Sequence, residues 1–206
     1  MTRNKGLAAL TVVILAVFWY IRADVPEAEK PTAGTNIIAF GDSLVEGHGA
    51  TPGNDFVSLL SRRIGAPIIN AGQGGDTTSA ALARLDSDVL ARDPRVVIVL
   101  LGGNDFLRRV PKEQTFANLA TIAERIRSTG AAVVLVGVNV GLWRDPYGDE
   151  YENVARRTSA GLVPDILDDI LGDQHLMTDS IHPNDRGYQI VADRVEPALR
   201  ELLKED

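Results

Sequence analysis

Residues 95–101 (RVVIVLL) constrain the fold of this chain more than any other segment, because almost every side chain among them is apolar. A strand with one face in water alternates polar and apolar side chains, so this run predicts a strand buried on both faces, as in the middle of a parallel sheet. We predict further strands at 36–40, 67–70 and 132–138. Helical spacing predicts helices at 55–64, 77–92, 113–129 and 184–203, the last of them kinked or split at Pro197.

Strands that alternate with helices along a chain form a parallel sheet with helices on both faces. A length of 206 residues provides for one such domain. In open sheets of this kind, ligands bind at the carboxyl ends of the strands, so the residues that follow each strand are candidates for a functional site. These segments are GDSL at 41–44, NAGQGGDT at 70–77 and GGND at 102–105, and a further polar segment, DSIHPN at 179–184, precedes the last helix.

These segments contain a serine, a histidine and an aspartate that suit acyl transfer. A serine hydroxyl becomes a good nucleophile when a base accepts its proton, and histidine is the side chain that most often serves as that base. We predict Ser43 as the nucleophile, His182 as its base and Asp179 as the carboxylate that orients the imidazole. The alternative bases are His48 and His175, and the alternative carboxylates are Asp168, Asp173 and Asp185.

The same segments supply hydrogen-bond donors for the negative oxygen that develops during acyl transfer. Each fixed donor of this kind is worth roughly 2.7–4 kcal/mol in the transition state. The candidates are the backbone amides of Ser43 and Gly75 and the side-chain amide of Asn104, with Gly74 as the alternative to Gly75.

Several other side chains stand close to these segments in the sequence. Asp42 and Asp105 are expected to brace their loops rather than to transfer protons. Leu107, Trp143 and Tyr147 either line a groove that binds the acyl chain of the substrate or pack within their own loops.

Taken in order, the four segments resemble the conserved blocks of the SGNH hydrolases, the GDSL family of esterases and lipases. FGDSL at 40–44, NAGQGGDTT at 70–78, GGND at 102–105 and DSIHPN at 179–184 are most similar to its bacterial branch of thioesterase I, lysophospholipase and arylesterase. The similarity extends over about 36–203, which is nearly the whole of the predicted domain.

The resemblance implies a three-layer α/β/α, flavodoxin-like fold with a mostly parallel five-stranded sheet. It implies hydrolysis of carboxylic ester or thioester bonds, as in lysophospholipids, acyl thioesters or aryl esters, through an acyl-enzyme and without a metal ion or other cofactor. It also places a variable substrate loop at 139–152. Two alternative functions are a carbohydrate O-deacetylase acting on cell-envelope polysaccharide and a non-catalytic, membrane-tethered binding domain.

The N-terminus has the pattern of a membrane-targeting segment. Arg3 and Lys5 precede an uncharged run at 6–21, which as a helix would measure about 24 Å against the ~30 Å of a bilayer core. This run predicts an uncleaved anchor in the inner membrane or a signal peptide cleaved after Ala23, and either would place the domain in the periplasm or another extracytoplasmic compartment. The expected organisation is a signal anchor or signal peptide at 1–23, a linker at 24–35 and the hydrolase domain at 36–206.

Charge and composition exclude several classes of partner and site. Beyond residue 23 the chain has 18 basic and 28 acidic residues, a net charge of −10, which excludes the basic surface of a nucleic-acid-binding protein. The absence of cysteine excludes disulfides, a thiolate zinc site and a cysteine nucleophile. We expect a monomer whose partner is a small-molecule or lipid ester, with membrane contact through the N-terminal segment if it is retained.

Overall fold

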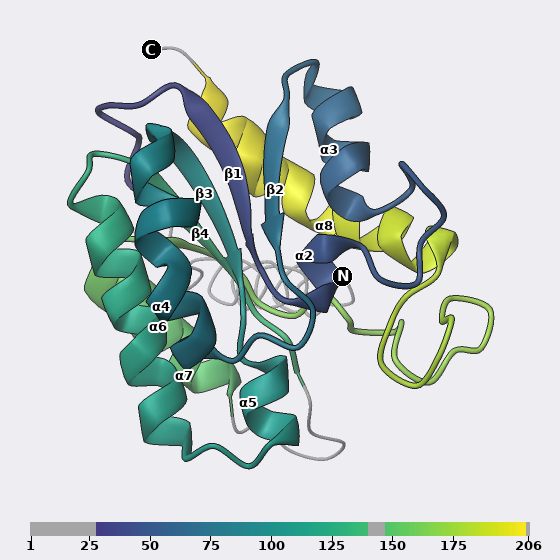
Figure 1. Ribbon diagram of the computed structural model, residues 1–206. Coiled ribbons are helices and arrows are strands. Elements are labelled where there is room, and N and C mark those ends of the chain that lie inside the picture. Colours follow the sequence, from purple (N-terminus) through teal and green to yellow (C-terminus); the bar gives the residue numbers. More distant parts are fainter. Residues whose placement is uncertain (1–27, 140–146, 205–206) are drawn as a thin grey trace, which may run out of the picture.

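Five parallel strands form the sheet, in the order β2-β1-β3-β4-β5 (Figure 1). The computed structural model describes residues 28–139 and 147–204. The predicted fold class is confirmed, with a sheet that is parallel throughout its described strands. The strands are β1 (Asn36–Gly41), β2 (Ile68–Gly72), β3 (Pro94–Leu100), β4 (Ala132–Val136) and β5 (Gly161–Val163).

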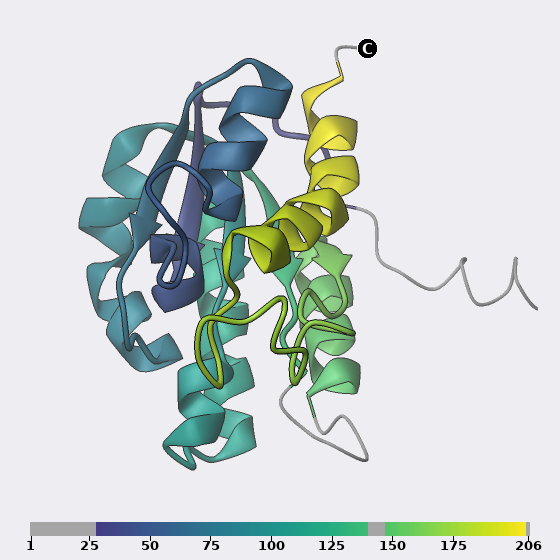
Figure 2. The same ribbon diagram turned by 90° about the vertical axis from the view of Figure 1, so that its right-hand side faces the viewer.

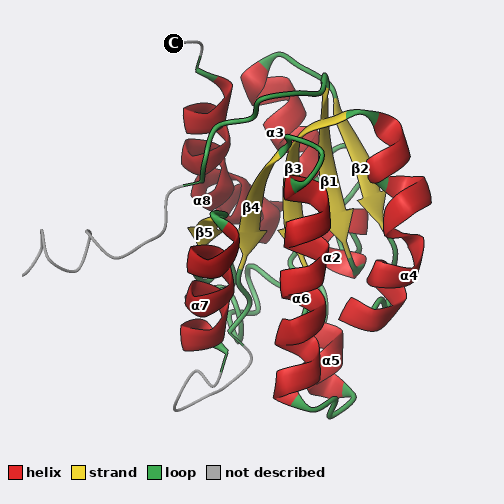
Figure 3. Ribbon diagram, turned by 90° about the vertical axis from the view of Figure 1, so that its left-hand side faces the viewer, coloured by secondary structure: helices red, strands yellow, loops and turns green. Residues whose placement is uncertain are grey.

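Helices cover both faces of the sheet and make the outer two of three layers. Figure 3 shows α4, α6 and α7 in front of the strands, and Figure 2 shows α3 and α8 on the opposite face. The helices are α2 (Ser43–Glu46), α3 (Phe56–Ile64), α4 (Thr78–Asp88), α5 (Gly103–Leu107), α6 (Lys112–Arg127), α7 (Gly148–Thr158) and α8 (Asp185–Leu203).

The central strand explains why its sequence is apolar at almost every position. Alternate side chains of a strand point to opposite faces. Val96, Ile98 and Leu100 pack toward α3 and α8, whereas Val97 and Val99 pack toward α4, α6 and α7. All five side chains are almost completely buried. The sheet therefore has a hydrophobic core on each face.

The structure differs from the sequence-based expectation in three elements. The strand β5 was not predicted, and α7 begins inside the region expected to be a variable loop. The buried residues of α7 are Tyr151, Val154, Ala155 and Thr158, a helical spacing that could have revealed it. The predicted split at Pro197 is wrong, because α8 continues through this residue while Val195 and Leu199 hold its apolar face against the core.

The carboxyl ends of the strands carry the segments that were expected to contain the site. In Figure 1, α2 and α5 begin directly beyond β1 and β3, and the loop that leads into α8 lies beside them. This loop is a narrow hairpin, because Met177 pairs with Pro183 as an antiparallel bridge and the Thr178 amide donates to the His182 carbonyl at 2.9 Å. The hairpin presents residues 179–182 to the end of the sheet.

The predicted N-terminal segment at 1–23 lies outside the described residues. From residue 28 the chain runs along the domain, where the Thr32 amide donates to the Gly130 carbonyl at 2.8 Å and Glu29 forms an ion pair with Arg127. Within the described ranges, no helix combines the length and the apolar character needed to cross a bilayer.

Candidate active site

Ser43 lies at the sharp turn from β1 into α2. Gly41 ends β1 where the strands approach so closely that a Cβ atom there would lie 2.2 Å from the carbonyl oxygen of Leu100. The side chain of Asp42 then caps α2 by accepting the backbone N–H of Leu44 at 3.0 Å. The turn therefore fixes Ser43 at the first position of a helix, with its side chain in the cavity at the end of the sheet.

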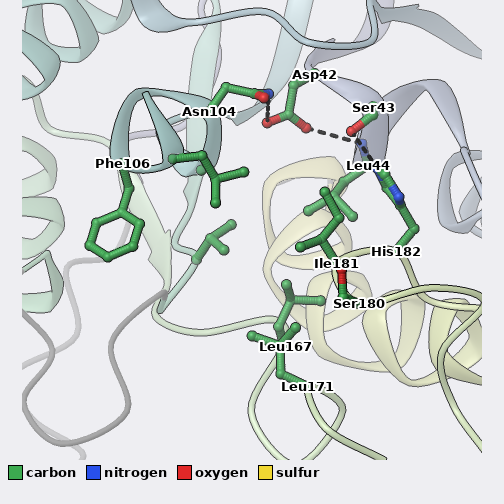
Figure 4. A pocket seen from close by; sticks show the side chains of 13 residues that line it. Asp42, Ser43, Leu44, Asn104, Phe106, Leu167, Leu171, Ser180, Ile181 and His182 are labelled. Carbon is green, nitrogen blue, oxygen red and sulfur yellow. Dashed lines mark hydrogen bonds between the residues drawn. The ribbon is translucent and has the colours of Figure 1, made fainter. Parts of the chain in front are cut away.

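His182 reaches Ser43 from the hairpin before α8. Its Nε2 atom lies 3.0 Å from Ser43 Oγ, although the two residues are 139 positions apart in the chain (Figure 4). This is hydrogen-bond distance, as a base that accepts the serine proton requires. The predicted pairing of these two side chains is thus present in the geometry.

Asp179 holds the other side of the imidazole ring. Its Oδ2 atom lies 2.7 Å from His182 Nδ1, and its Oδ1 atom accepts the backbone N–H groups of Ile181 at 2.9 Å and of His182 at 2.8 Å. The hydrogen bond from His182, followed by those from the backbone, lowers the pKa of Asp179 to about 2. Asp179 is therefore an acceptor at Nδ1 at working pH, which leaves Nε2 to accept the proton of Ser43.

A lowered pKa also gives the direction of the pH dependence of stability. The carboxyl of Asp179 binds its proton more weakly in the folded state than in the unfolded chain. Its contribution to stability is therefore complete above the ordinary pKa of 3.8 and is lost as the pH falls through about 2.

The alternative residues lie elsewhere or have other partners. His175 is exposed in the loop before α8, where its backbone amide donates to Asp173. Asp185 accepts the backbone and hydroxyl groups of Thr51, both at 2.7 Å. His48 does stand beside the site, with its ring centroid 4.3 Å from that of His182.

Asn104 projects from the first turn of α5 toward the same cavity as Ser43. Its side-chain Nδ2 donates to Asp42 Oδ2 at 3.3 Å. An amide nitrogen carries two hydrogens, so the bond to Asp42 orients the group and leaves the second hydrogen for a substrate oxygen. The turn before it is tight, since Gly102 has φ +121° and a Cβ atom there would lie 2.5 Å from the hydroxyl of Tyr151.

Gly75 lies on the loop after β2 and has φ +80°, in the left-handed region that glycine adopts without strain. The guanidinium group of Arg108 donates to its carbonyl at 2.8 Å and so fixes the peptide between residues 75 and 76. Its neighbour Gly74 also stands close to the site, since a Cβ atom at that position would lie 4.0 Å from Ser43 Cβ. The glycine loop thus borders Ser43 at Gly74, and the choice of Gly75 rather than Gly74 as the donor stays a prediction.

Two buried carboxyl groups brace the loops, as the sequence predicted. Asp105 is fully buried and accepts the Thr78 backbone amide at 2.8 Å and the Thr78 hydroxyl at 2.6 Å, which ties α5 to α4. Asp42 joins the ends of β1 and β3 through Leu44 and Asn104. Burial is the main cause that raises the pKa of Asp42 from 3.8 to about 6.

The raised pKa of Asp42 predicts that the protein loses stability as the pH rises from about 4 to 7. The folded state holds this proton more tightly than the unfolded chain, so the stabilisation is complete below 3.8 and is lost as the pH rises through about 6. The pKa difference corresponds to a change of about 3 kcal/mol in the free energy of unfolding.

Urea unfolding of the wild type and of Asp42→Asn between pH 4 and about 7 measures this change. The variant should lack this part of the decline, and parallel profiles would contradict the assignment.

A cavity of about 220 Å³ opens beside Ser43 and His182 (Figure 4). Most of its wall is apolar, and it includes every large hydrophobic side chain that is exposed in the described part of the chain. Surface exposure of large apolar side chains gathered at one place is typical of a binding site. These four side chains are Phe106, Leu107, Leu171 and Ile181, with exposed fractions of 37%, 55%, 40% and 41%.

Comparison with known proteins assigns the chain to a family. Residues 39–190 match the model of the GDSL-like lipase/acylhydrolase family. The chain belongs to this family. It is 32% identical to esterase TesA of Pseudomonas aeruginosa over 84% of this chain and 92% of that protein. It is 28% identical to thioesterase 1/protease 1/lysophospholipase L1 of Escherichia coli, over 86% of this chain and 89% of that protein.

Solved structures extend the likeness to the fold. The psychrotrophic esterase EstA from Pseudoalteromonas sp. superimposes with a TM-score of 0.74 at 26% identity, over 82% of this chain and 99% of EstA. This GDSL hydrolase is therefore an enzyme of the esterase and lipase type, as its sequence blocks indicated.

The three residues predicted to bind the substrate of this GDSL hydrolase have different positions in the structure. Leu107 lines the cavity. Tyr147 is not part of the cavity wall; it is 4% exposed and lies behind that wall, edge-on to the rings of Phe106 and the buried Phe116. Trp143 lies outside the described residues.

Much of the cavity wall was not predicted from the sequence. Val138 follows β4, whereas Leu167, Leu171 and Ile181 come from the long segment before α8. Single apolar residues in a segment without periodicity carry no pattern, and only the fold brings them to one place. Of the apolar residues of this wall, the sequence had indicated only Leu107 as a candidate for substrate binding.

Proposed function

We propose that this GDSL hydrolase cleaves carboxylic esters or thioesters of medium or long acyl chains through a Ser43–His182–Asp179 triad. The observation that carries the proposal is the continuous hydrogen-bonded chain from Ser43 Oγ to His182 Nε2, at 3.0 Å, and from His182 Nδ1 to Asp179 Oδ2, at 2.7 Å. A chain of this kind activates a serine and stabilises the imidazolium that forms when the serine proton is transferred.

The reaction proceeds in two acyl transfers. Ser43 Oγ attacks the carbonyl carbon while His182 takes its proton, and the negative oxygen accepts hydrogen bonds from the amides of Ser43 and Gly75 and from Asn104. His182 then gives the proton to the departing alcohol or thiol, which leaves an acyl group on Ser43. Water, activated by His182 in the same way, releases the acid. His182 carries the proton in both transfers, so the enzyme returns to its starting state.

The apolar cavity supports an acyl chain as the group that is bound. Its walls offer few polar partners for a sugar, whereas its exposed apolar side chains would be covered by a lipid tail. The name of one relative points the same way, since thioesterase 1/protease 1/lysophospholipase L1 of Escherichia coli is named in part for thioesters and lysophospholipids.

The N-terminal run at 6–21 supports an extracytoplasmic location. With the run retained as an anchor in the inner membrane, the domain would stand within reach of lysophospholipids and other lipid esters. With the run removed as a signal peptide, the same domain would act in the periplasm as a monomer.

A series of p-nitrophenyl esters from acetate to palmitate tests the substrate class. Each methylene that enters the cavity contributes up to about 0.8 kcal/mol, or roughly fourfold in kcat/KM. We expect kcat/KM to rise steeply from acetate to octanoate. The variant Leu171→Asn should lose most of this rise while its activity on acetate changes little, because Leu171 lines the part of the cavity away from Ser43 and His182 (Figure 4).

The opposite profile would change the assignment. A sharp preference for acetate, with little hydrolysis of octanoate, would contradict the lipid proposal. The carbohydrate O-deacetylase would then be the better description of the same triad.

A further inference from the structure

A second imidazole stands against the triad. The ring centroids of His48 and His182 are 4.3 Å apart with their planes tilted by 54°. One ligand atom from each of His48, His182 and Asp179 lies within 4.8 Å of the other two. We propose that these three side chains bind a divalent transition metal such as Zn²⁺, and that the bound metal stops hydrolysis.

The donor set determines which metals the site would take. Two imidazole nitrogens and one carboxylate oxygen suit Zn²⁺, Cu²⁺ and Ni²⁺, whereas Mg²⁺ and Ca²⁺ prefer sites made of oxygen alone. Three protein ligands leave the fourth tetrahedral position of Zn²⁺ to water.

The geometry needs a modest closure, and the exposed members can provide it. Zinc bonds of 2.0–2.1 Å place neighbouring ligand atoms about 3.3 Å apart. Side chains at up to 4.8 Å must therefore approach by roughly 1.5 Å. His48 is exposed and its side chain can turn without disturbing the core, whereas Asp179 would exchange its bond to His182 Nδ1 for one to the metal.

The backbone around His48 holds its side chain at the site. Its amide donates to the Ser43 carbonyl at 3.0 Å, and its carbonyl accepts the hydroxyl of Tyr188 at 2.7 Å. Neither bond involves the imidazole, so a substitution of the side chain leaves both in place. His48 is therefore a ligand that can be removed without dismantling the turn.

Inhibition follows because both nitrogens of His182 are already in use. Nδ1 bonds Asp179 at 2.7 Å and Nε2 bonds Ser43 at 3.0 Å. A metal needs the lone pair of one of these nitrogens. On Nε2 it takes the place of the Ser43 hydroxyl. On Nδ1 it takes the place of the carboxylate and leaves the ring proton on Nε2, so in both cases His182 has no lone pair to accept the proton of Ser43. This consequence rests on the proposed role of His182, whereas the binding of the metal does not.

The first test is inhibition of the full chain, without a histidine tag, by Zn²⁺. Hydrolysis of p-nitrophenyl butyrate should fall in a saturable way, recover with EDTA and be unaffected by Mg²⁺. Loss of a residue that only hydrogen-bonds a metal ligand already weakens metal affinity by about tenfold or more. Loss of the ligand itself in His48→Asn should therefore raise the half-inhibitory concentration of Zn²⁺ by at least that factor. His175→Asn, which removes the one remaining histidine, should not shift it.

Direct binding separates the two parts of the inference. Calorimetric titration of Ser43→Ala with ZnCl₂ should show one ion per chain, and the double variant with His48→Asn should lose this binding. Equal zinc binding or equal inhibition with and without His48 would overturn the site. Binding that depends on His48 but leaves hydrolysis intact would preserve the site and contradict the role of His182 as base.

Discussion

Replacement of Ser43 by alanine is expected to lower kcat for ester hydrolysis by about 10⁶-fold, the loss seen when the serine of a triad is removed. The fold should persist, since Ser43 occupies the first turn of α2 and alanine is a good helix former. The same variant should also resist labelling by a fluorophosphonate, which reacts with an activated serine. EstA, which shares this fold, was crystallised in a form inhibited by monoethylphosphonate.

Ser180 provides the matched control for this experiment. It lines the same cavity two residues before His182, but it takes no part in the hydrogen-bonded chain that leads to Asp179. Ser180→Ala should therefore keep both its labelling and most of its activity. Labelling of Ser43→Ala at the rate of the wild type would refute the nucleophile, and a wild type that is never labelled would favour the non-catalytic binding domain.

Replacement of Asp179 by asparagine should lower kcat by roughly 10³–10⁴-fold with the fold retained. The amide oxygen of the new side chain can still accept the backbone N–H groups of Ile181 and His182. Its NH₂ group, however, would face Nδ1 as a donor, which moves the imidazole proton to Nε2. His182 then has no lone pair to accept the proton of Ser43.

The size of this effect depends on how much water can replace the carboxylate. The side chain of Asp179 is 44% exposed, so the loss should lie toward the lower end of that range. Asp185→Asn is the control, because this carboxylate accepts hydrogen bonds from Thr51 rather than from His182, and its loss should leave kcat nearly unchanged. Activity of Asp179→Asn within tenfold of the wild type would show that another group orients His182.

Local sequence patterns were enough to predict the central strands and the segments at their ends. The runs of β1, β3 and β4 are apolar on both faces, and only the interior of a parallel sheet buries both faces of a strand. Because all strands run the same way, the residues that follow them meet at one edge. The juxtaposition of Ser43 and Asn104 thus followed from the sequence alone.

Tertiary contacts decided what short segments could not signal. The strand β5 is only three residues long, and it forms because β4 offers it an unpaired edge. Tyr147 was predicted near the substrate, but its ring is buried among the aromatic side chains of α5, α6 and α7. Neither the formation of β5 nor the burial of Tyr147 has a pattern within a short segment. Both depend on which strand edges and apolar surfaces are still exposed when the rest of the sheet and its helices are in place.

The sequence by itself therefore determined the fold class and the type of chemistry, because hydrophobic periodicity and the residues that follow each strand can be recognised within short segments. The tertiary structure alone decided the apolar wall of the cavity and the approach of His48 to His182. These features join side chains from segments far apart in the chain, and their distances are set by the packing of α8 and its hairpin against the sheet. Packing is a property of the whole core, and no single segment specifies it.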